Sequence, residues 1–153
     1  MISLYLSNKT MENKELLSIK SVYKEFEIEG HSEHLKVLEN IDLTVKTNEF
    51  LSIIGQSGTG KSTLLRSIAG LLRTTRGEIT FEDKIINEPD ANIGMVFQHF
   101  ALFPWLTVEK NISFGLENRK EISREQINKR VSNLIEMIGL TGFEKAYPKI
   151  GRA

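Results

Sequence analysis

The eight residues Gly55-Gln-Ser-Gly-Thr-Gly-Lys-Ser62 constrain this chain of 153 residues more than any other segment. They fit the pattern G-x-x-x-x-G-K-[ST], and they follow a nearly continuous apolar run at 50–54. Helical spacing of apolar residues begins directly after them and continues over 61–72. A strand that leads through a glycine-rich loop into a helix is the context in which this motif binds a phosphate. The sequence therefore predicts a nucleotide site.

The residue types in this loop suit a phosphate ligand. Glycine tolerates backbone angles that direct successive N–H groups at one anion, and the start of the following helix adds unpaired N–H groups and a positive dipole end. We expect Lys61 to reach the β- and γ-phosphates and to act in catalysis, and the Ser62 hydroxyl to bind Mg²⁺. Further predicted nucleotide-binding residues are Gly55, Gln56, Ser57, Gly58, Thr59, Gly60 and Thr63.

Apolar spacing around the loop predicts an α/β fold. Between residues 16 and 50 apolar side chains alternate in two runs, which is typical of antiparallel strands with one covered face. Residues 50–54 are nearly continuous and rich in β-branched side chains, so they predict a strand that is buried on both faces. A further alternating stretch occupies 77–82, with a short return at 85–86, and 93–97 forms another buried-looking run.

From Thr107 onward the spacing predicts helices. Thr107 is a suitable N-cap for a helix that begins at Val108. Ser123 and Gln126 have the spacing of a capping box, in which each side chain satisfies a free backbone N–H of the other residue. Gly139 is placed to end the helix that follows them.

Composition narrows the class of protein. Lys and Arg number 20 and so do Asp and Glu, so the net charge is zero and we expect no nucleic acid among the partners. Cysteine is absent from the sequence, which excludes disulfides, thiolate zinc sites and cysteine nucleophiles. Apolar runs stay well below the roughly 18 residues of a membrane span. A cytoplasmic domain is the expectation.

Residues 15–148 resemble the N-terminal part of the ATP-binding subunit of ABC transporters. The segment Ile19–Phe26 is similar to the first strand of that family, which ends in an aromatic residue that stacks on adenine; Phe26 matches it better than Tyr23. The segment Gly94–Gln98 resembles the glutamine loop, and the resemblance implies that Gln98 contacts Mg²⁺ and the attacking water. The implied cofactors are ATP and Mg²⁺.

The resemblance also implies the architecture. It predicts an α/β P-loop NTPase fold of ABC type, with a parallel core sheet, an antiparallel β subdomain and the start of a helical subdomain, incomplete at its C-terminal end. Within it, 15–98 would form the β subdomain and the P-loop core, and 99–148 would begin the helical subdomain. Residues 1–14 are expected to be a disordered leader or a miscalled start.

Partners follow from the same resemblance. In the family, the loop that corresponds to Ala101–Trp105 receives a coupling helix of the membrane permease, so Phe103 and Trp105 either fill a partner groove or pack locally beneath the loop. A second ATPase subunit completes the site, and the assembly lies on the inner face of the cell membrane. The segment Glu88–Gln98 is similar to importers of the nitrate, sulfonate, taurine and bicarbonate group.

The sequence departs from the family after Pro148. The chain reads Lys149–Ala153 in place of the signature Leu-Ser-Gly-Gly-Gln, and it lacks the strand with the Mg²⁺-binding Asp, the catalytic Glu and the switch His. Ile150–Ala153 resembles a piece found after the signature, which suggests an internal deletion or a frameshift.

Three hypotheses result from the sequence. The chain is an ATPase subunit that powers uptake of a small anion, or a truncated nucleotide-binding remnant without turnover, or an unrelated P-loop kinase or GTPase. The alternating stretch at 77–86 and the Gly94–Gln98 run argue against the third hypothesis.

Overall fold

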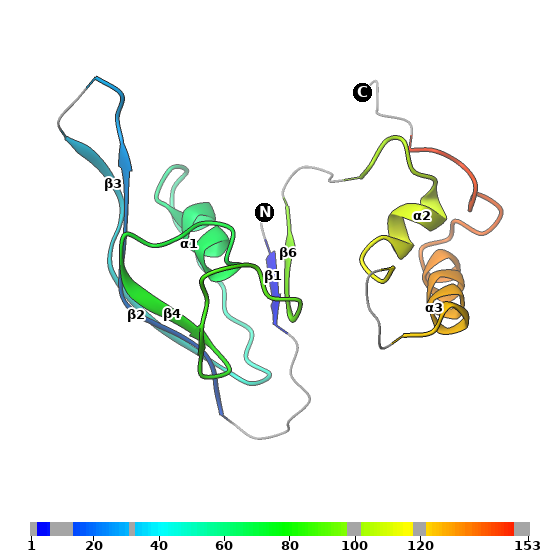
Figure 1. The fold of residues 1–153 in the computed structure, drawn as a ribbon, viewed down its shortest axis with the longest axis horizontal. Helices are drawn as coiled ribbons and strands as arrows, with labels where there is room; N and C mark the ends of the chain where they lie inside the picture. Colours follow the sequence, from blue (N-terminus) through cyan, green and yellow to red (C-terminus); the bar gives the residue numbers. More distant parts are fainter. Residues whose placement is uncertain (1–2, 7–13, 31–32, 98–101, 118–121, 149–153) are drawn as a thin grey trace. The chain divides into compact units, whose positions relative to one another are not determined.

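The computed structural model describes residues 3–6, 14–30, 33–97, 102–117 and 122–148 (Figure 1). Two compact units, 1–98 and 99–153, make up the chain. The first unit contains β1 (Ser3–Leu6), β2 (Glu15–Glu27), β3 (His34–Lys46), α1 (Lys61–Ile68), β4 (Arg76–Phe81), β5 (Lys84–Ile85) and β6 (Ile93–Val96). The second unit contains α2 (Val108–Ser113) and α3 (Arg124–Met137).

An antiparallel sheet with the strand order β3-β2-β4-β5 is the largest element of the first unit. Its register pairs Leu17 with Val45 and with Phe81, on the two neighbouring strands of β2. The long β2–β3 ribbon and the short β4–β5 hairpin confirm the antiparallel strands expected between 16 and 50 and between 77 and 86. Alternation was a sufficient signal here because one face of this sheet is covered.

Helix α1 covers that face of the sheet (Figure 1). Leu64 and Ile68 of α1 pack against a buried cluster from the strands, which consists of Leu17, Ile19, Val22, Leu38, Val45 and Ile79. The helix is shorter than the predicted 61–72, since it ends at Ile68 and Gly70 follows with a φ of 71°. A Cβ on Gly70 would lie 2.3 Å from the carbonyl oxygen of Glu88, so only glycine fits at this turn.

The prediction of a strand buried on both faces at 50–54 is wrong. These residues form no strand, and the side chains of Phe50 and Ile54 are each 91% exposed. The second run expected to be buried, β6, pairs antiparallel with β1 in a separate two-stranded sheet, and Val96 is exposed. A strand buried on both faces needs neighbours at its edges and cover above and below. The described elements supply neither to 50–54, so no parallel core sheet forms among them.

Strand β1 falls within residues 1–14, which were expected to be disordered. Ser3–Leu6 pair with Ile93–Val96, so this part of the segment differs from a disordered leader. Pairing with β6 gives these backbone groups the hydrogen-bond partners that a leader would lack. That the segment is a miscalled start stays a prediction.

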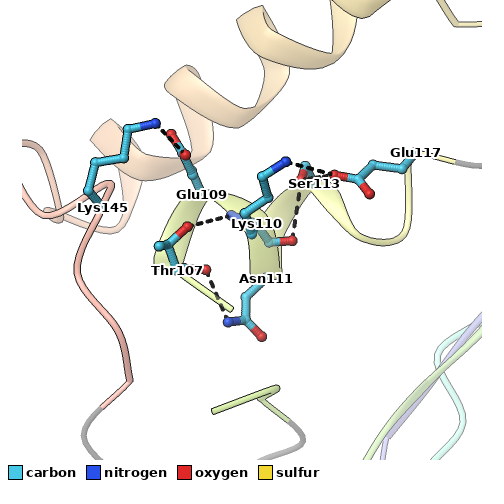
Figure 2. Close-up of polar contacts among 7 residues, drawn as sticks. All are labelled: Thr107, Glu109, Lys110, Asn111, Ser113, Glu117 and Lys145. Carbon is cyan, nitrogen blue, oxygen red and sulfur yellow. Dashed lines mark hydrogen bonds and ion pairs between the residues drawn. The ribbon is translucent and has the colours of Figure 1, made fainter. Parts of the chain in front are cut away.

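The second unit is a pair of short helices with the predicted caps. The Thr107 hydroxyl accepts a hydrogen bond from the backbone N–H of Lys110 at the start of α2 (Figure 2), and Ser123 and Gln126 form both bonds of a capping box at the start of α3. Gly139, with a φ of 70°, follows the end of α3. Ile127, Val131 and Ile135 of α3 form the buried centre, against which the apolar face of α2 packs.

Polar contacts tie α2 to the chain that follows α3. The backbone N–H groups of Val108 and Glu109 donate to the carbonyl oxygens of Ala146 and Glu144, at 2.9 and 3.1 Å. The Lys145 ammonium contacts the Glu109 carboxylate at 2.6 Å (Figure 2). These bonds satisfy N–H groups in the first turn of α2 that have no partner within the helix. None of the helices in the described residues is long and apolar enough to cross a membrane.

Candidate functional site

The glycine-rich loop approaches β3 at its last glycine. Gly60 has a φ of 85°, and a Cβ at this position would lie 2.7 Å from the carbonyl oxygen of Val37 and 3.0 Å from the Leu38 side chain. Any other residue would be strained by its backbone angle and would collide with the strand. Gly60 therefore fixes where the loop ends and where α1 begins.

The start of α1 is open to an anion. Gly60 is the N-cap, and it offers no side chain that could accept a hydrogen bond from the first turn. An acidic residue is also lacking in that turn, so no carboxylate neutralises the positive end of the helix. Unpaired N–H groups at a helix start, next to a loop with glycines at positive φ (Gly58 and Gly60), form a typical phosphate-binding arrangement.

The Lys61 side chain folds back over the loop. Its ammonium donates to the carbonyl oxygen of Gly55 at 2.8 Å, to the carbonyl oxygen of Gln56, and to the Thr59 hydroxyl at 3.2 Å. The Thr59 hydroxyl in turn donates to the Gln56 carbonyl at 2.9 Å. These contacts hold the only cation of the loop beside the carbonyl oxygens of Gly55 and Gln56 and the Thr59 hydroxyl.

The residues of this site fit a magnesium ion that takes a hydroxyl oxygen and nucleotide phosphate oxygens as its ligands. Ser62 is exposed in the first turn of α1, and a hydroxyl oxygen is the hard ligand that Mg²⁺ prefers. Among the described residues, no group of three or more His, Asp or Glu residues could hold a metal ion. An ion bound here would therefore take most of its ligands from phosphate oxygens and water, with Ser62 as a protein ligand. Gln98, the other predicted magnesium ligand, lies outside the described residues.

The two candidate adenine-stacking residues differ in their surroundings. Tyr23 is half-buried in β2, and the Arg76 guanidinium lies over its ring, 4.3 Å from the centroid. Arg76 is held there by an ion pair with Glu25, at 3.2 Å. Phe26 lies one residue before the end of β2 and is 36% exposed, with the Lys24 ammonium 4.9 Å from its centroid. A cation thus lies over each ring, and Phe26 is the more exposed of the two residues.

A second candidate surface lies in the loop before α2. Phe103 packs against Phe114, with ring centroids 4.5 Å apart, and against Trp105 at 5.5 Å. Trp105 is 69% exposed, and Leu102 and Phe114 are also exposed. Ala101, the first residue of the predicted docking segment, lies outside the described residues.

Asn111 holds this loop in shape, and sequence reasoning missed it. Its side-chain oxygen accepts from the backbone N–H of Phe103 at 2.8 Å. Its amide group donates to the carbonyl oxygens of Phe103, Leu106 and Thr107, at 3.1, 3.0 and 3.1 Å; Figure 2 shows the last of these bonds. A signal was present, because an Asn four residues after an N-cap threonine lies on the face of the first helical turn.

Comparisons with known proteins agree with this geometry. The family profile described as "ABC transporter" matches residues 38–151. Among solved structures, the chain is similar to an ATP-binding cassette described as a dimer in a post-hydrolysis state bound to ADP and Pi. The TM-score is 0.71 at 30% sequence identity, and the match covers 87% of this chain and 62% of the cassette.

Curated relatives match over most of this chain and over less of their own length. An uncharacterized ABC transporter ATP-binding protein of Methanocaldococcus jannaschii is 46% identical over 86% of this chain and 48% of its own. A nitrate import ATP-binding protein of Synechocystis is 44% identical (73% and 42%), and a spermidine/putrescine import ATP-binding protein of Clostridium novyi is 41% identical (84% and 36%). The chain thus spans about half or less of the length of these relatives.

Proposed function

The chain belongs to the ABC transporter family and has the fold of an ABC-type ATPase, and from this premise we propose that it is an ATP-binding subunit, or part of one, in an import system. In this role it would couple ATP binding and hydrolysis to uptake of a solute. The observation that carries the proposal is the loop geometry. Lys61 is held over a glycine-rich loop at an uncapped, acid-free helix start, which is the arrangement that a triphosphate requires.

We propose distinct roles for the residues of the site. The N–H groups of the loop and of the first turn of α1 would surround the phosphates, and Lys61 would neutralise the β- and γ-phosphates. Ser62 would bind Mg²⁺ beside Thr63, and Gln98 would bind the ion and orient the attacking water. Phe26 would stack on adenine, because it is the more exposed of the two aromatic residues and lies near the end of β2.

Turnover by these 153 residues alone is proposed to be negligible. Phosphoryl transfer needs a group that positions or deprotonates the attacking water. The sequence contains neither the Leu-Ser-Gly-Gly-Gln signature nor the acidic pair that the family uses. A second ATPase subunit would supply the signature to the composite site. The alternative function is a nucleotide-binding remnant that never turns over, even beside a complete partner.

The aromatic loop is proposed to contact the permease. The contacts favour local packing for Phe103, which packs between two rings. They favour the partner groove for Trp105, which keeps most of its surface exposed. A rigid loop with an exposed Trp is the typical anchor of a protein interface. Residues 99–148 would form the start of a helical subdomain, and 15–98 would form the β subdomain and the P-loop core. The protein would lie at the inner face of the cell membrane.

The imported solute is proposed to be a small anion such as nitrate, sulfonate or taurine. Support comes from the Glu88–Gln98 segment and from the relative named for nitrate import. The relative named for spermidine/putrescine import is nearly as similar, so the support for import is broader than the support for an anion. Uptake assays with labelled nitrate, taurine and spermidine, in cells with and without the gene, separate these solutes.

Binding of Mg-ATP tests the proposed function. We expect saturable binding of a fluorescent ATP analogue by the wild-type chain, and a loss of at least tenfold in affinity in Lys61→Ala. Lys84→Ala is the matched control, because Lys84 is an exposed lysine on β5 of the same unit. Equal losses in both variants, or none in Lys61→Ala, would refute the assignment.

Hydrolysis measured on the same preparation distinguishes the two functions. We expect phosphate release at the background rate from these residues alone. Release that rises on addition of a complete cassette carrying a Lys→Ala change in its own loop would favour an active subunit. No rise in that mixture would favour the remnant.

A further inference from the structure

The Lys61 ammonium has as many acceptors as it has hydrogen atoms. A protonated lysine donates three hydrogen bonds. The structure gives Lys61 three acceptors: the carbonyl oxygens of Gly55 and Gln56, and the Thr59 hydroxyl. A phosphate oxygen that binds this ammonium must therefore take the place of one of them.

The three acceptors differ in how easily a phosphate oxygen can displace them from the Lys61 ammonium. Gly55 and Gln56 offer backbone carbonyls, and moving either would change the path of the loop. Thr59 offers a hydroxyl at the end of a rotatable side chain, and its contact with the ammonium is 3.2 Å, against 2.8 Å for the Gly55 carbonyl. The hydroxyl also has a second partner, since its hydrogen atom points to the Gln56 carbonyl 2.9 Å away. Its oxygen can release Lys61 and keep that bond.

The Thr59 hydroxyl also lies beside the first glycine of the loop. A Cβ built on Gly55 would be 3.1 Å from it and 3.9 Å from the Lys61 ammonium nitrogen. The hydroxyl and the ammonium are thus both next to the first glycine of the loop. The Thr59 oxygen occupies one hydrogen-bonding direction of the ammonium, which a phosphate oxygen could take in its place.

We propose that Thr59 is a positioning residue whose hydroxyl is exchanged for a phosphate oxygen when nucleotide binds. The two carbonyls would orient Lys61 in both states, and the hydroxyl would be the one acceptor that leaves. Wild-type affinity would then include the cost of breaking the Thr59–Lys61 bond. This inference rests on the proposed function, because it needs a phosphate at Lys61.

Variants at positions 59 and 61 test the exchange, and their affinity for the fluorescent ATP analogue is the quantity measured. Thr59→Val has nearly the same shape without the hydroxyl, so we expect its Kd to fall about threefold, the effect of one exposed hydrogen bond to a charged group. Thr59→Ser restores the acceptor and should return the Kd toward the wild-type value. In a Lys61→Ala background, Thr59→Val should have no effect on Kd, because the ammonium it acts through is gone.

The outcomes distinguish a failure of the Thr59 exchange from a failure of the proposed ATP-binding function. If Lys61→Ala weakens binding while Thr59→Val leaves the Kd unchanged or raises it, the exchange is wrong and the ATP site stands. A gain in Thr59→Val that persists in the Lys61→Ala background also overturns the exchange, since it would act by another route. If Lys61→Ala binds as the wild type does, both the site and the exchange fail. Far-UV circular dichroism of each variant confirms that it is folded.

Discussion

Replacement of Gly60 by alanine should lower the free energy of unfolding more than replacement of Gly58, although both glycines have a positive φ. Gly60 has a φ of 85° and Gly58 a φ of 82°, so an L-residue at either site pays about 1–2 kcal/mol for its backbone angle. The unfolded chain loses the same entropy in both variants, and that term cancels in the comparison. The difference lies in the surroundings of the new methyl group.

The surroundings set the magnitude. A Cβ on Gly58 would meet no atom within 4 Å, whereas a Cβ on Gly60 would lie 2.7 Å from the Val37 carbonyl oxygen, where ordinary contacts begin at 3.4 Å. Relief requires the loop to move away from β3, and Leu64 and Ile68 in the core follow it. Overpacking of this kind costs about 1–3 kcal/mol. We expect Gly60→Ala to lose about 2–5 kcal/mol in unfolding free energy, and Gly58→Ala about 1–2 kcal/mol.

Urea unfolding followed by far-UV circular dichroism measures both variants on the same scale. The predicted result is a lower midpoint for Gly60→Ala than for Gly58→Ala at an unchanged m-value. Equal losses, within about 0.5 kcal/mol, would show that the close approach to β3 does not constrain the loop.

Three other changes test separate parts of the structure. Asn111→Leu removes four hydrogen bonds to the backbone of 103–107, so we expect it to destabilise the second unit by about 2 kcal/mol. Urea unfolding followed by the fluorescence of the single tryptophan, Trp105, measures this loss. An unfolding midpoint equal to that of the wild type would contradict the role of Asn111. The exposed apolar side chains of 50–54 should promote self-association of the protein. Ile54→Lys places a charge in this run, so we expect less self-association in sedimentation velocity, and an unchanged size distribution would contradict this role of the run. A hydrogen bond from the Gly142 N–H lowers the pKa of Glu144, so its stabilising effect should be present above the ordinary carboxyl pKa and lost as pH falls through the lowered pKa. The stability difference between wild type and Glu144→Gln should therefore be largest at neutral pH and shrink in acid; a difference that does not depend on pH would contradict this assignment.

Features that depend on neighbours in sequence were predicted well. The Thr107 cap and the Ser123–Gln126 capping box each join atoms three residues apart, and both are present. The alternation of β2 and β3 was equally informative, because one face of their sheet is covered by α1. The shape of the glycine-rich loop at the start of α1 belongs to the same group, since its glycines and its lysine lie within one short segment; its binding of a phosphate stays a prediction.

Features that depend on distant partners were missed or wrong. The run 50–54 has the composition of a buried strand, but burial depends on strands and layers beside it, which the described elements do not provide. The approach of Gly60 to Val37 joins residues on separate elements, so the motif alone indicated a flexible glycine and not the collision.

Backbone amide shifts on addition of a non-hydrolysable Mg-ATP analogue test the central claim most directly. ¹⁵N-labelled protein should show its largest shifts in residues 55–63, because those N–H groups would donate to the phosphates. Smaller shifts are expected near Phe26, where the adenine would stack. Saturable shifts confined to the second unit, with 55–63 unchanged, would contradict the account.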